Sequence, residues 1–267
     1  MVSTDVVGNA VPEKAGSSAA VTEVSKGLTG NGQADPDAKW VSRFVLESDP
    51  QSRHFVFDLP GQWWSRPYEY RWASEFAEPG DVALDAASGV PHPLKFFLVD
   101  HCAEVHAVDI DERITDDEAI RRDVRKVYGT EVAQHLIDGV EHRKASLTAL
   151  PYPDGKFDKV YCISVLEHLS DPFNKWPWLL PLRSLLGFLS PTIEASLREF
   201  RRVLKDDGLM VLTFDHPRIS LQYVQYLVDR LGLEFAGPCD FSKPAGVLNW
   251  EGRGLCCVRT VLRKRRS

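Results

Sequence analysis

The amino-acid sequence predicts an α/β fold in which a mostly parallel sheet of seven strands carries helices on both faces. Short apolar runs alternate with helical stretches, the pattern typical of such a sheet. The last two runs are joined by a long link that reads as an extended hairpin, so the final strand is expected to be antiparallel. The chain has 267 residues, of which 43% are apolar and 10% aromatic, enough to build a large core.

The strands are predicted where β-branched, aromatic and aliphatic residues cluster. The five that precede the final pair are expected at 81–84, 104–109, 140–145, 157–163 and 209–214. The final pair is expected at 233–236 and 255–262.

The helices are predicted from apolar residues that recur at helical spacing. We expect them at 94–99, 116–136, from 190 to a stop at 206–208, and at 219–231. The third of these begins with Ser190 and Pro191, a capping residue followed by proline at the first helical position.

Two segments differ in composition from the rest of the chain. Residues 1–39 contain no Phe, Tyr or Trp and are rich in small and polar residues, so we expect them to be disordered. Residues 40–267 then form one domain. Within it, 171–190 is an apolar insertion broken by three prolines.

Charge and cysteine content exclude several classes of protein. The net charge of −6 disfavours nucleic acid as a partner, and no apolar run is long enough for a transmembrane segment. The five cysteines form no C-x-x-C pair, which indicates neither a zinc site nor a disulfide framework. A reducing, cytoplasmic location without a metal fits this pattern best.

Ligands of such sheets bind at the carboxyl ends of the strands. After the first strand, the turn from Asp85 to Pro91 consists mainly of small residues, which allow close approach of a ligand to the backbone. Asp109 ends the second strand, where a carboxylate can accept hydrogen bonds from both hydroxyls of a ribose. No G-x-G-x-x-G follows the first strand, which argues against a nicotinamide-dependent reductase.

Four motifs together resemble one family. The turn LDAASG and the segment AVDID are followed by LPYPDGKFD at 150–158, VYCISVLEHL at 160–169 and EFRRVLKDDGL at 199–209. This succession resembles the Rossmann-like class I S-adenosylmethionine-dependent methyltransferases, and most of all their small-molecule branch, which includes quinone-biosynthesis enzymes. The resemblance implies a methyltransferase with S-adenosyl-L-methionine as its cofactor.

The same resemblance implies roles for individual residues. Asp109 would hold the ribose, Ile110 would pack beside the adenine, and Ser146 and Leu147 would lie at its edge. The residues expected around the methionine half are Asp85, Ala87, Ser88 and Gly89, with Ser164 at the mouth of the fourth strand. Apart from the resemblance, the aromatic segment before the first strand is expected to place Arg66 or Tyr70 near the cofactor carboxylate. Where the family has a third turn glycine this chain has Pro91, and where it often has an acidic residue this chain has Ser146. These departures keep open a degenerate methyltransferase fold that serves as a binding or partner subunit.

The methyl acceptor is expected to be a small, partly apolar or aromatic molecule. Trp63 and Trp64 precede the first strand, and Trp176 and Trp178 follow the fourth, so these four are predicted to form a lid over the acceptor. The alternative for both tryptophan-containing segments is that they pack on the sheet. A further alternative for the insertion at 171–190 is contact with a second subunit of a homo-oligomer or with a membrane surface. His168 and His216 follow the fourth and fifth strands and are the candidate general bases.

Overall fold

The computed structural model describes residues 37–169, 190–250 and 253–266. The chain divides into two units, 1–35 and 36–267, and the elements below belong to the second. The predicted disorder of 1–39 falls almost wholly outside the described residues. So does the predicted insertion at 171–190 apart from Ser190, and with it Trp176 and Trp178.

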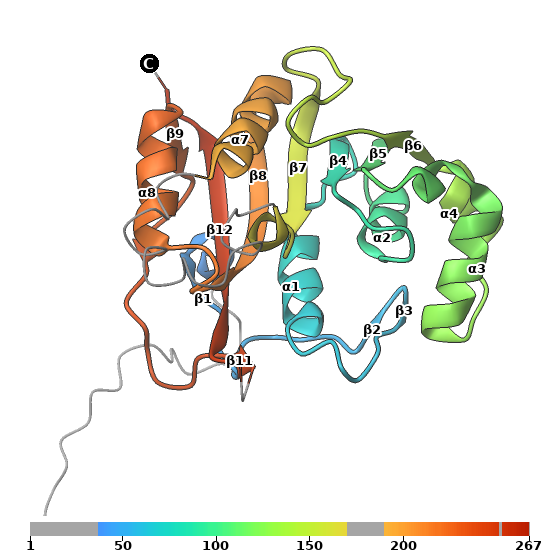
Figure 1. Ribbon diagram of the computed structural model, residues 1–267, viewed down its shortest axis with the longest axis horizontal. Coiled ribbons are helices and arrows are strands. Elements are labelled where there is room, and N and C mark those ends of the chain that lie inside the picture. Colours follow the sequence, from blue (N-terminus) through green and yellow to red (C-terminus); the bar gives the residue numbers. More distant parts are fainter. Residues whose placement is uncertain (1–36, 170–189, 251–252, 267) are drawn as a thin grey trace, which may run out of the picture. The chain divides into compact units, whose positions relative to one another are not determined.

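A mixed sheet forms the centre of the second unit, with the strand order β10-β1-β12-β8-β7-β4-β5-β6 (Figure 1). Strands β8, β7, β4, β5 and β6 are parallel, and β12 pairs antiparallel with β8. These six are β4 (Val82–Ala86), β5 (Glu104–Asp109), β6 (Val140–Lys144), β7 (Phe157–Ile163), β8 (Leu204–His216) and β12 (Leu255–Lys264). The predicted mostly parallel sheet with an antiparallel last strand is confirmed.

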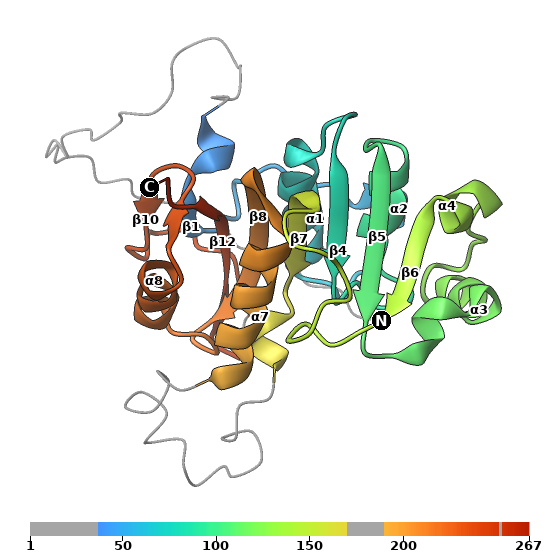
Figure 2. The same cartoon turned by 90° about the horizontal axis from the view of Figure 1, so that it is seen from above.

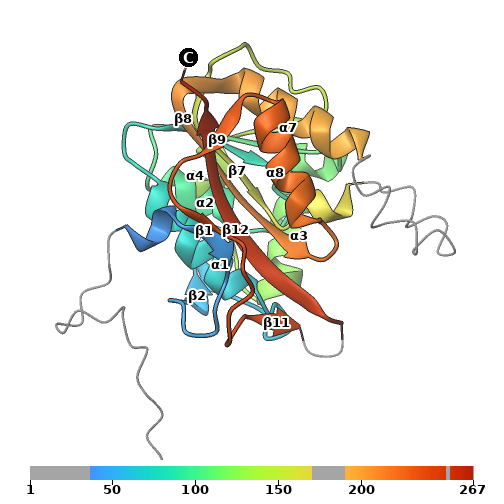
Figure 3. The same ribbon diagram turned by 90° about the vertical axis from the view of Figure 1, so that its left-hand side faces the viewer.

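The predicted number of seven strands is wrong, because the sheet has ten in the described residues. The strands missed are β1 (Ser42–Phe44), β10 (Cys239–Asp240) and β11 (Asn249–Trp250). Along β12, β11 pairs with its beginning, and β9 (Leu233–Phe235) pairs with its end (Figure 3). Strands of two or three residues are too short to show a period of two in the sequence. A separate hairpin joins β2 (His54–Phe55) to β3 (Phe57–Asp58).

Helices cover both faces of the sheet, as predicted (Figure 2). On one face, α7 (Pro191–Val203) and α8 (Leu221–Arg230) pack against inward residues such as Leu84 and Val160. On the other face, α1 (Arg66–Ala73) and α2 (Leu94–Val99) pack against Ala83 and Tyr161, the residues next to Leu84 and Val160 in the same strands. Alternate residues of each strand therefore serve opposite hydrophobic layers.

The predicted helix at 116–136 is two helices, α3 (Asp117–Tyr128) and α4 (Gln134–Asp138). Asp116 caps α3 by accepting hydrogen bonds from the N–H groups of Glu118 and Ala119. Gly129 ends α3 in the left-handed conformation, with φ of 69°, and its N–H bonds to the carbonyl of Arg125. A glycine within a charged, periodic stretch thus marks a helix end.

The junction between α7 and β8 also differs from the prediction. The helix ends at Val203 rather than at Gly208, and β8 begins at once with Leu204. The pairing of β7 with β8 shifts register between Phe157 and Lys159, which accommodates the additional strand residues as a bulge. Ser190 occupies the N-cap of α7, but its side chain makes no capping hydrogen bond. Among the described residues, no helix has the length and apolar character needed to cross a bilayer.

Candidate active site

A cavity of about 240 Å³ opens at the carboxyl ends of β4 and β7. It is lined by the turn after β4, the start of α1 and the segment that follows β7. The lining residues are Arg66, Tyr70, Asp85, Ala87, Ser88, Gly89, His92, Leu94, Ile163, Ser164, Val165 and His168. The cavity therefore lies at the edge of the sheet where the sequence predicts a ligand.

The turn after β4 has a backbone that side chains rarely allow. Ala87 has φ of 56°, a conformation that costs a residue with a side chain about 1–2 kcal/mol. Gly89 has φ of 64°, and a Cβ added there would lie 2.5 Å from Cδ2 of His92. Position 89 therefore requires glycine, and its bare backbone faces the cavity.

Lys95 stabilises this turn through three hydrogen bonds from its side chain. Its side chain is fully buried and donates hydrogen bonds to Oγ of Ser88 (3.1 Å) and to the carbonyls of Gly89 (2.7 Å) and His92 (2.8 Å). Burial lowers the pKa of Lys95 to about 8, against the opposing effect of the Asp85 and Asp109 charges. Sequence analysis did not identify Lys95, because a lysine in a short helix gives no sign that it points inward.

The two predicted acidic positions differ in their surroundings. Asp109 lies beside the turn and accepts hydrogen bonds from the N–H of Gly89 (2.8 Å) and the N–H of Asp111 (2.9 Å). Asp85 lines the cavity, and its buried Oδ2 has no hydrogen-bond partner. Burial raises the pKa of Asp85 to about 6. Asp109 is therefore hydrogen-bonded to the turn, whereas Asp85, within the described residues, presents an unpaired oxygen at the cavity.

The residues predicted around an adenine lie outside the cavity lining in the described part of the chain. Ile110 is 76% exposed, although it is a large apolar side chain. Ser146 is exposed and its hydroxyl lies 2.9 Å from that of Thr148. Leu147 is buried in the main hydrophobic core, so its side chain packs inside the protein.

Arg66 enters the cavity from the first turn of α1, supported by a buried carboxylate. Glu69 accepts a hydrogen bond of 2.7 Å from Nη1 of Arg66. Four further donors complete its shell: the hydroxyls of Ser65 (3.0 Å), Ser164 (2.5 Å) and Thr213 (2.6 Å), and the thiol of Cys257 (3.4 Å). Burial alone would raise the pKa of Glu69, but the Arg66 charge and these hydrogen bonds hold it below its ordinary value. Glu69 could not be identified from the sequence, because three of its partners, Ser164, Thr213 and Cys257, come from distant segments.

An aromatic layer borders the cavity. The hydroxyl of Tyr70 lies 2.8 Å from Nδ1 of His92, and the Trp63 ring stacks on His92 at 4.7 Å between centroids. Burial lowers the pKa of His92 well below its ordinary value, so the ring is neutral. Trp64 packs instead against Trp250, at 6.2 Å between ring centroids. Of the two described lid candidates, Trp63 therefore contacts the cavity wall.

The two candidate bases occupy different places. His168 lines the cavity, and its pKa is lowered by burial and by the nearby charges of Arg218 and Arg66. His216 is not among the described residues that line the cavity. Its Nδ1 lies 3.2 Å from the carbonyl of Ile219, and its ring packs edge-on against Phe44. Only His168 is therefore brought beside the cavity.

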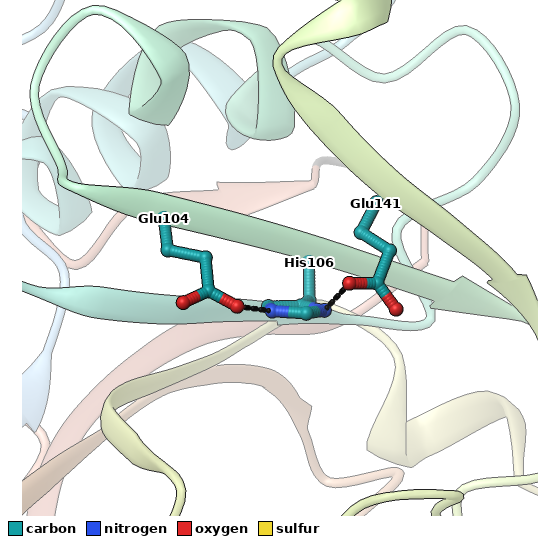
Figure 4. Close-up of side chains that lie close together, drawn as sticks. All are labelled: Glu104, His106 and Glu141. Atoms are coloured by element: carbon teal, nitrogen blue, oxygen red, sulfur yellow. Dashed lines mark hydrogen bonds and ion pairs between the residues drawn. The ribbon is translucent and has the colours of Figure 1, made fainter.

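A second polar cluster lies toward the amino-terminal ends of β5 and β6 (Figure 4). The buried ring of His106 lies between two carboxylates, with Nε2 2.5 Å from Glu104 and Nδ1 3.4 Å from Glu141. Lys156 adds an ion pair of 3.1 Å to Glu104. These contacts tie β5 to β6 at the end of β5 away from Asp109.

Comparisons with known proteins bear on this geometry. Residues 84–176, about a third of the chain, match a family described as a methyltransferase domain. A solved structure from Pyrococcus horikoshii is 18% identical, with a TM-score of 0.50 over 77% of this chain and 92% of that one. A TehB-like SAM-dependent methyltransferase from Corynebacterium glutamicum is 17% identical, with a TM-score of 0.44 over 74% and 87%.

A [4+2]-cyclase, SpnF, is 15% identical, with a TM-score of 0.49 over 82% of this chain and 89% of that one. No curated protein matches the chain. The matched methyltransferase domain includes the strained turn, Asp109 and most of the β7 segment that lines the cavity. Residues 84–176 of this chain are therefore similar to a methyltransferase domain, and its fold is similar to that of the Pyrococcus horikoshii structure.

Proposed function

We propose that the chain transfers the methyl group of S-adenosylmethionine to a small, partly apolar or aromatic molecule. The observation that carries this proposal is the aromatic layer at the cavity, where Trp63 stacks on His92 and Tyr70 lines the wall. Aromatic rings around a few polar groups are typical of sites for small organic ligands.

The turn after β4 fits the methionine half of the cofactor. Glycine at position 89 leaves backbone exposed where a Cβ would clash, so a ligand can approach it closely. The unpartnered Oδ2 of Asp85 suits the amino group of the methionine part. The guanidinium of Arg66 suits its carboxylate, with Tyr70 beside it. Ala87, Ser88 and Ser164 complete this wall.

The adenosine half would extend past the cavity along the end of β5. Asp109 is bonded to the turn and retains lone pairs that can accept from ribose hydroxyls. Ile110 presents an exposed apolar surface directly after it, which suits one face of the adenine. Ser146 would lie at the edge of the base, and Leu147 would support that edge from within the core.

When bound, the cofactor supplies an electrophilic methyl group on a sulfonium sulfur. The remaining work of the chain is to orient the acceptor and to remove a proton. His168 lines the cavity with a lowered pKa, so near neutral pH its ring is unprotonated and can accept that proton. Trp63, which stacks on the cavity-lining His92, would cover the acceptor.

Cofactor binding is tested by calorimetric titration of the full chain with S-adenosylhomocysteine and, separately, with NADH. We expect the first to bind and the second not to bind. Asp109→Asn should weaken the binding of S-adenosylhomocysteine by about tenfold or more, because a charged hydrogen-bond acceptor is lost. Asp111→Asn is the matched control, because this neighbouring carboxylate pairs with Arg113. Equal losses in both variants would contradict the assigned role of Asp109.

The acceptor class is tested by incubating the protein with methyl-labelled cofactor and fractionated cell extract. The expected result is label in the small-molecule fraction that partitions into organic solvent. Label confined to protein or nucleic acid would overturn the proposed acceptor class. S-adenosylhomocysteine binding without any transfer would favour the degenerate alternative.

A further inference from the structure

Two buried carboxylates near the cavity have no role in the proposed cofactor binding or methyl transfer. Glu167 lies in the short 3-10 helix Leu166–His168, two residues after the cavity-lining Val165, and precedes His168. Asp215 is the penultimate residue of β8. Since β7 and β8 are parallel neighbours, both acids lie at the same edge of the sheet as the cavity.

Both oxygens of Glu167 and one oxygen of Asp215 lack a hydrogen-bond donor in the described part of the chain. Glu167 is 5% exposed and neither of its oxygens has a partner. Asp215 is 7% exposed, and its buried Oδ1 has no partner. Glu69, buried nearby, has five donors around its two oxygens. The contrast shows that this region can supply donors to a buried carboxylate, yet its described residues supply none to Glu167 and none to Oδ1 of Asp215.

An unpaired buried carboxylate destabilises a folded protein, because it loses its hydration without gaining a donor. An unsatisfied buried polar group in a folded protein needs an explanation, and a catalytic or ligand-binding role is one such explanation. We infer that Glu167 and Asp215 receive a basic nitrogen of the methyl acceptor. This inference rests on the proposed function and narrows its acceptor to an organic amine that enters as the ammonium ion.

The charges around the pair favour a cation. Burial, with the repulsion of Asp215, raises the pKa of Glu167 to about 8. Burial, with the repulsion of Glu69, raises the pKa of Asp215 to about 6. Two positive charges act against this rise in pKa. Arg66 is hydrogen-bonded to Glu69, and Arg218 lowers the pKa of Asp215. An incoming ammonium would restore ionisation of the pair and supply the missing donors.

The chemistry balances without a further reactant. For this amine acceptor the carboxylate pair takes the place of His168 as the base. The bound ammonium gives one proton to the pair and becomes a neutral amine. The amine lone pair forms the new N–CH₃ bond while the S–CH₃ bond breaks, and the electron pair of that bond stays on sulfur. The products are a neutral thioether and a methylated ammonium, and the proton on the acids returns to solvent when the product leaves.

The test compares 2-phenylethylammonium with 2-phenylethanol, which has the same shape but no charge. Binding to the full chain, saturated with S-adenosylhomocysteine, is measured by calorimetry near neutral pH. We expect the ammonium to bind at least about tenfold more tightly than the alcohol. In the double variant Glu167→Gln, Asp215→Asn this preference should fall to within about twofold. Asp154→Asn, at an exposed carboxylate paired with Arg202, should keep the preference.

Each result decides the question. Equal binding of the amine and the alcohol, no binding of the amine, or a preference that survives in the double variant overturns the inference. S-adenosylhomocysteine affinity and circular dichroism confirm that the variants are folded. Failure of the wild-type chain to bind S-adenosylhomocysteine would refute the proposed function instead, and the amine titration is repeated without it to separate the two failures.

Discussion

Replacing Glu167 by glutamine should change how the stability of the protein depends on pH. The glutamine has nearly the shape of the protonated acid but cannot ionise. Glu167 is buried without a hydrogen-bond partner, and burial followed by repulsion from Asp215 raises its pKa from 4.5 to about 8. A carboxyl whose pKa is raised on folding stabilises the protein while it is protonated. That stability is complete below the unfolded pKa and is lost as pH rises through the folded one.

The magnitude follows from the two pKa values. Each tenfold difference in proton affinity corresponds to about 1.4 kcal/mol, so ionising Glu167 in the folded state costs about 5 kcal/mol relative to the unfolded chain. At about pH 5 the wild type and Glu167→Gln should have similar free energies of unfolding. At about pH 9 the variant should be the more stable by up to that amount. The wild type alone should lose this stability across the interval from 4.5 to about 8.

The assay is guanidinium unfolding of both proteins at the two pH values. Glu69→Gln provides a control of opposite sign, because the Arg66 charge and hydrogen bonds lower the pKa of Glu69 despite its burial. Glu69 stabilises the fold above its unfolded pKa and loses this effect as pH falls through its folded one, so that variant should be destabilised near neutral pH. A difference between wild type and Glu167→Gln that stays constant with pH would refute the reasoning.

Three further substitutions test the turn. Gly89→Ala should weaken S-adenosylhomocysteine binding by about tenfold or more in calorimetry, because the new Cβ would meet His92 at 2.5 Å; unchanged affinity would contradict the close approach. Lys95→Met should lower the free energy of unfolding by about 3 kcal/mol in urea, since Ser88 and two carbonyls lose their donor; a smaller loss than about 1 kcal/mol would show that the turn stands without it. Ala87→Gly should raise Tm slightly, because it removes a φ cost of about 1–2 kcal/mol and adds about 0.5–1 kcal/mol of glycine entropy; a lower Tm would show that the methyl group packs usefully.

Three elements could be predicted from the sequence with the bounds that the structure shows. The predicted segments 94–99, 104–109 and 157–163 coincide with α2, β5 and β7. Each is bounded by residues that change local preference, and each buries side chains whose period matches its conformation. The contact between Gly89 and Asp109 also followed, since adjacent parallel strands bring their carboxyl ends together.

Elements that depend on partners could not be predicted in the same way. Residues 204–208 form the beginning of β8, although their Asp-Asp-Gly sequence is typical of a turn. They do so because a bulge in the pairing of β7 with β8 accommodates them. The two-residue and three-residue strands at the edge of the sheet form because β12 and β1 offer unpaired backbone. Tertiary pairing overrides local propensity in these segments.

The order of apolar runs, the small-residue turn and the carboxylate after the second strand are local properties, so the sequence alone determined the fold class and the edge of the sheet where the cavity lies. The electrostatics of the site depend on which distant side chains meet away from water. Only the tertiary structure decided that Lys95 is buried beneath the turn and that Glu69 is surrounded by hydrogen-bond donors. It also decided that Glu167 and Oδ1 of Asp215 have no donor among the residues that the structure describes. Burial and partners, rather than residue type, set the charge of such groups.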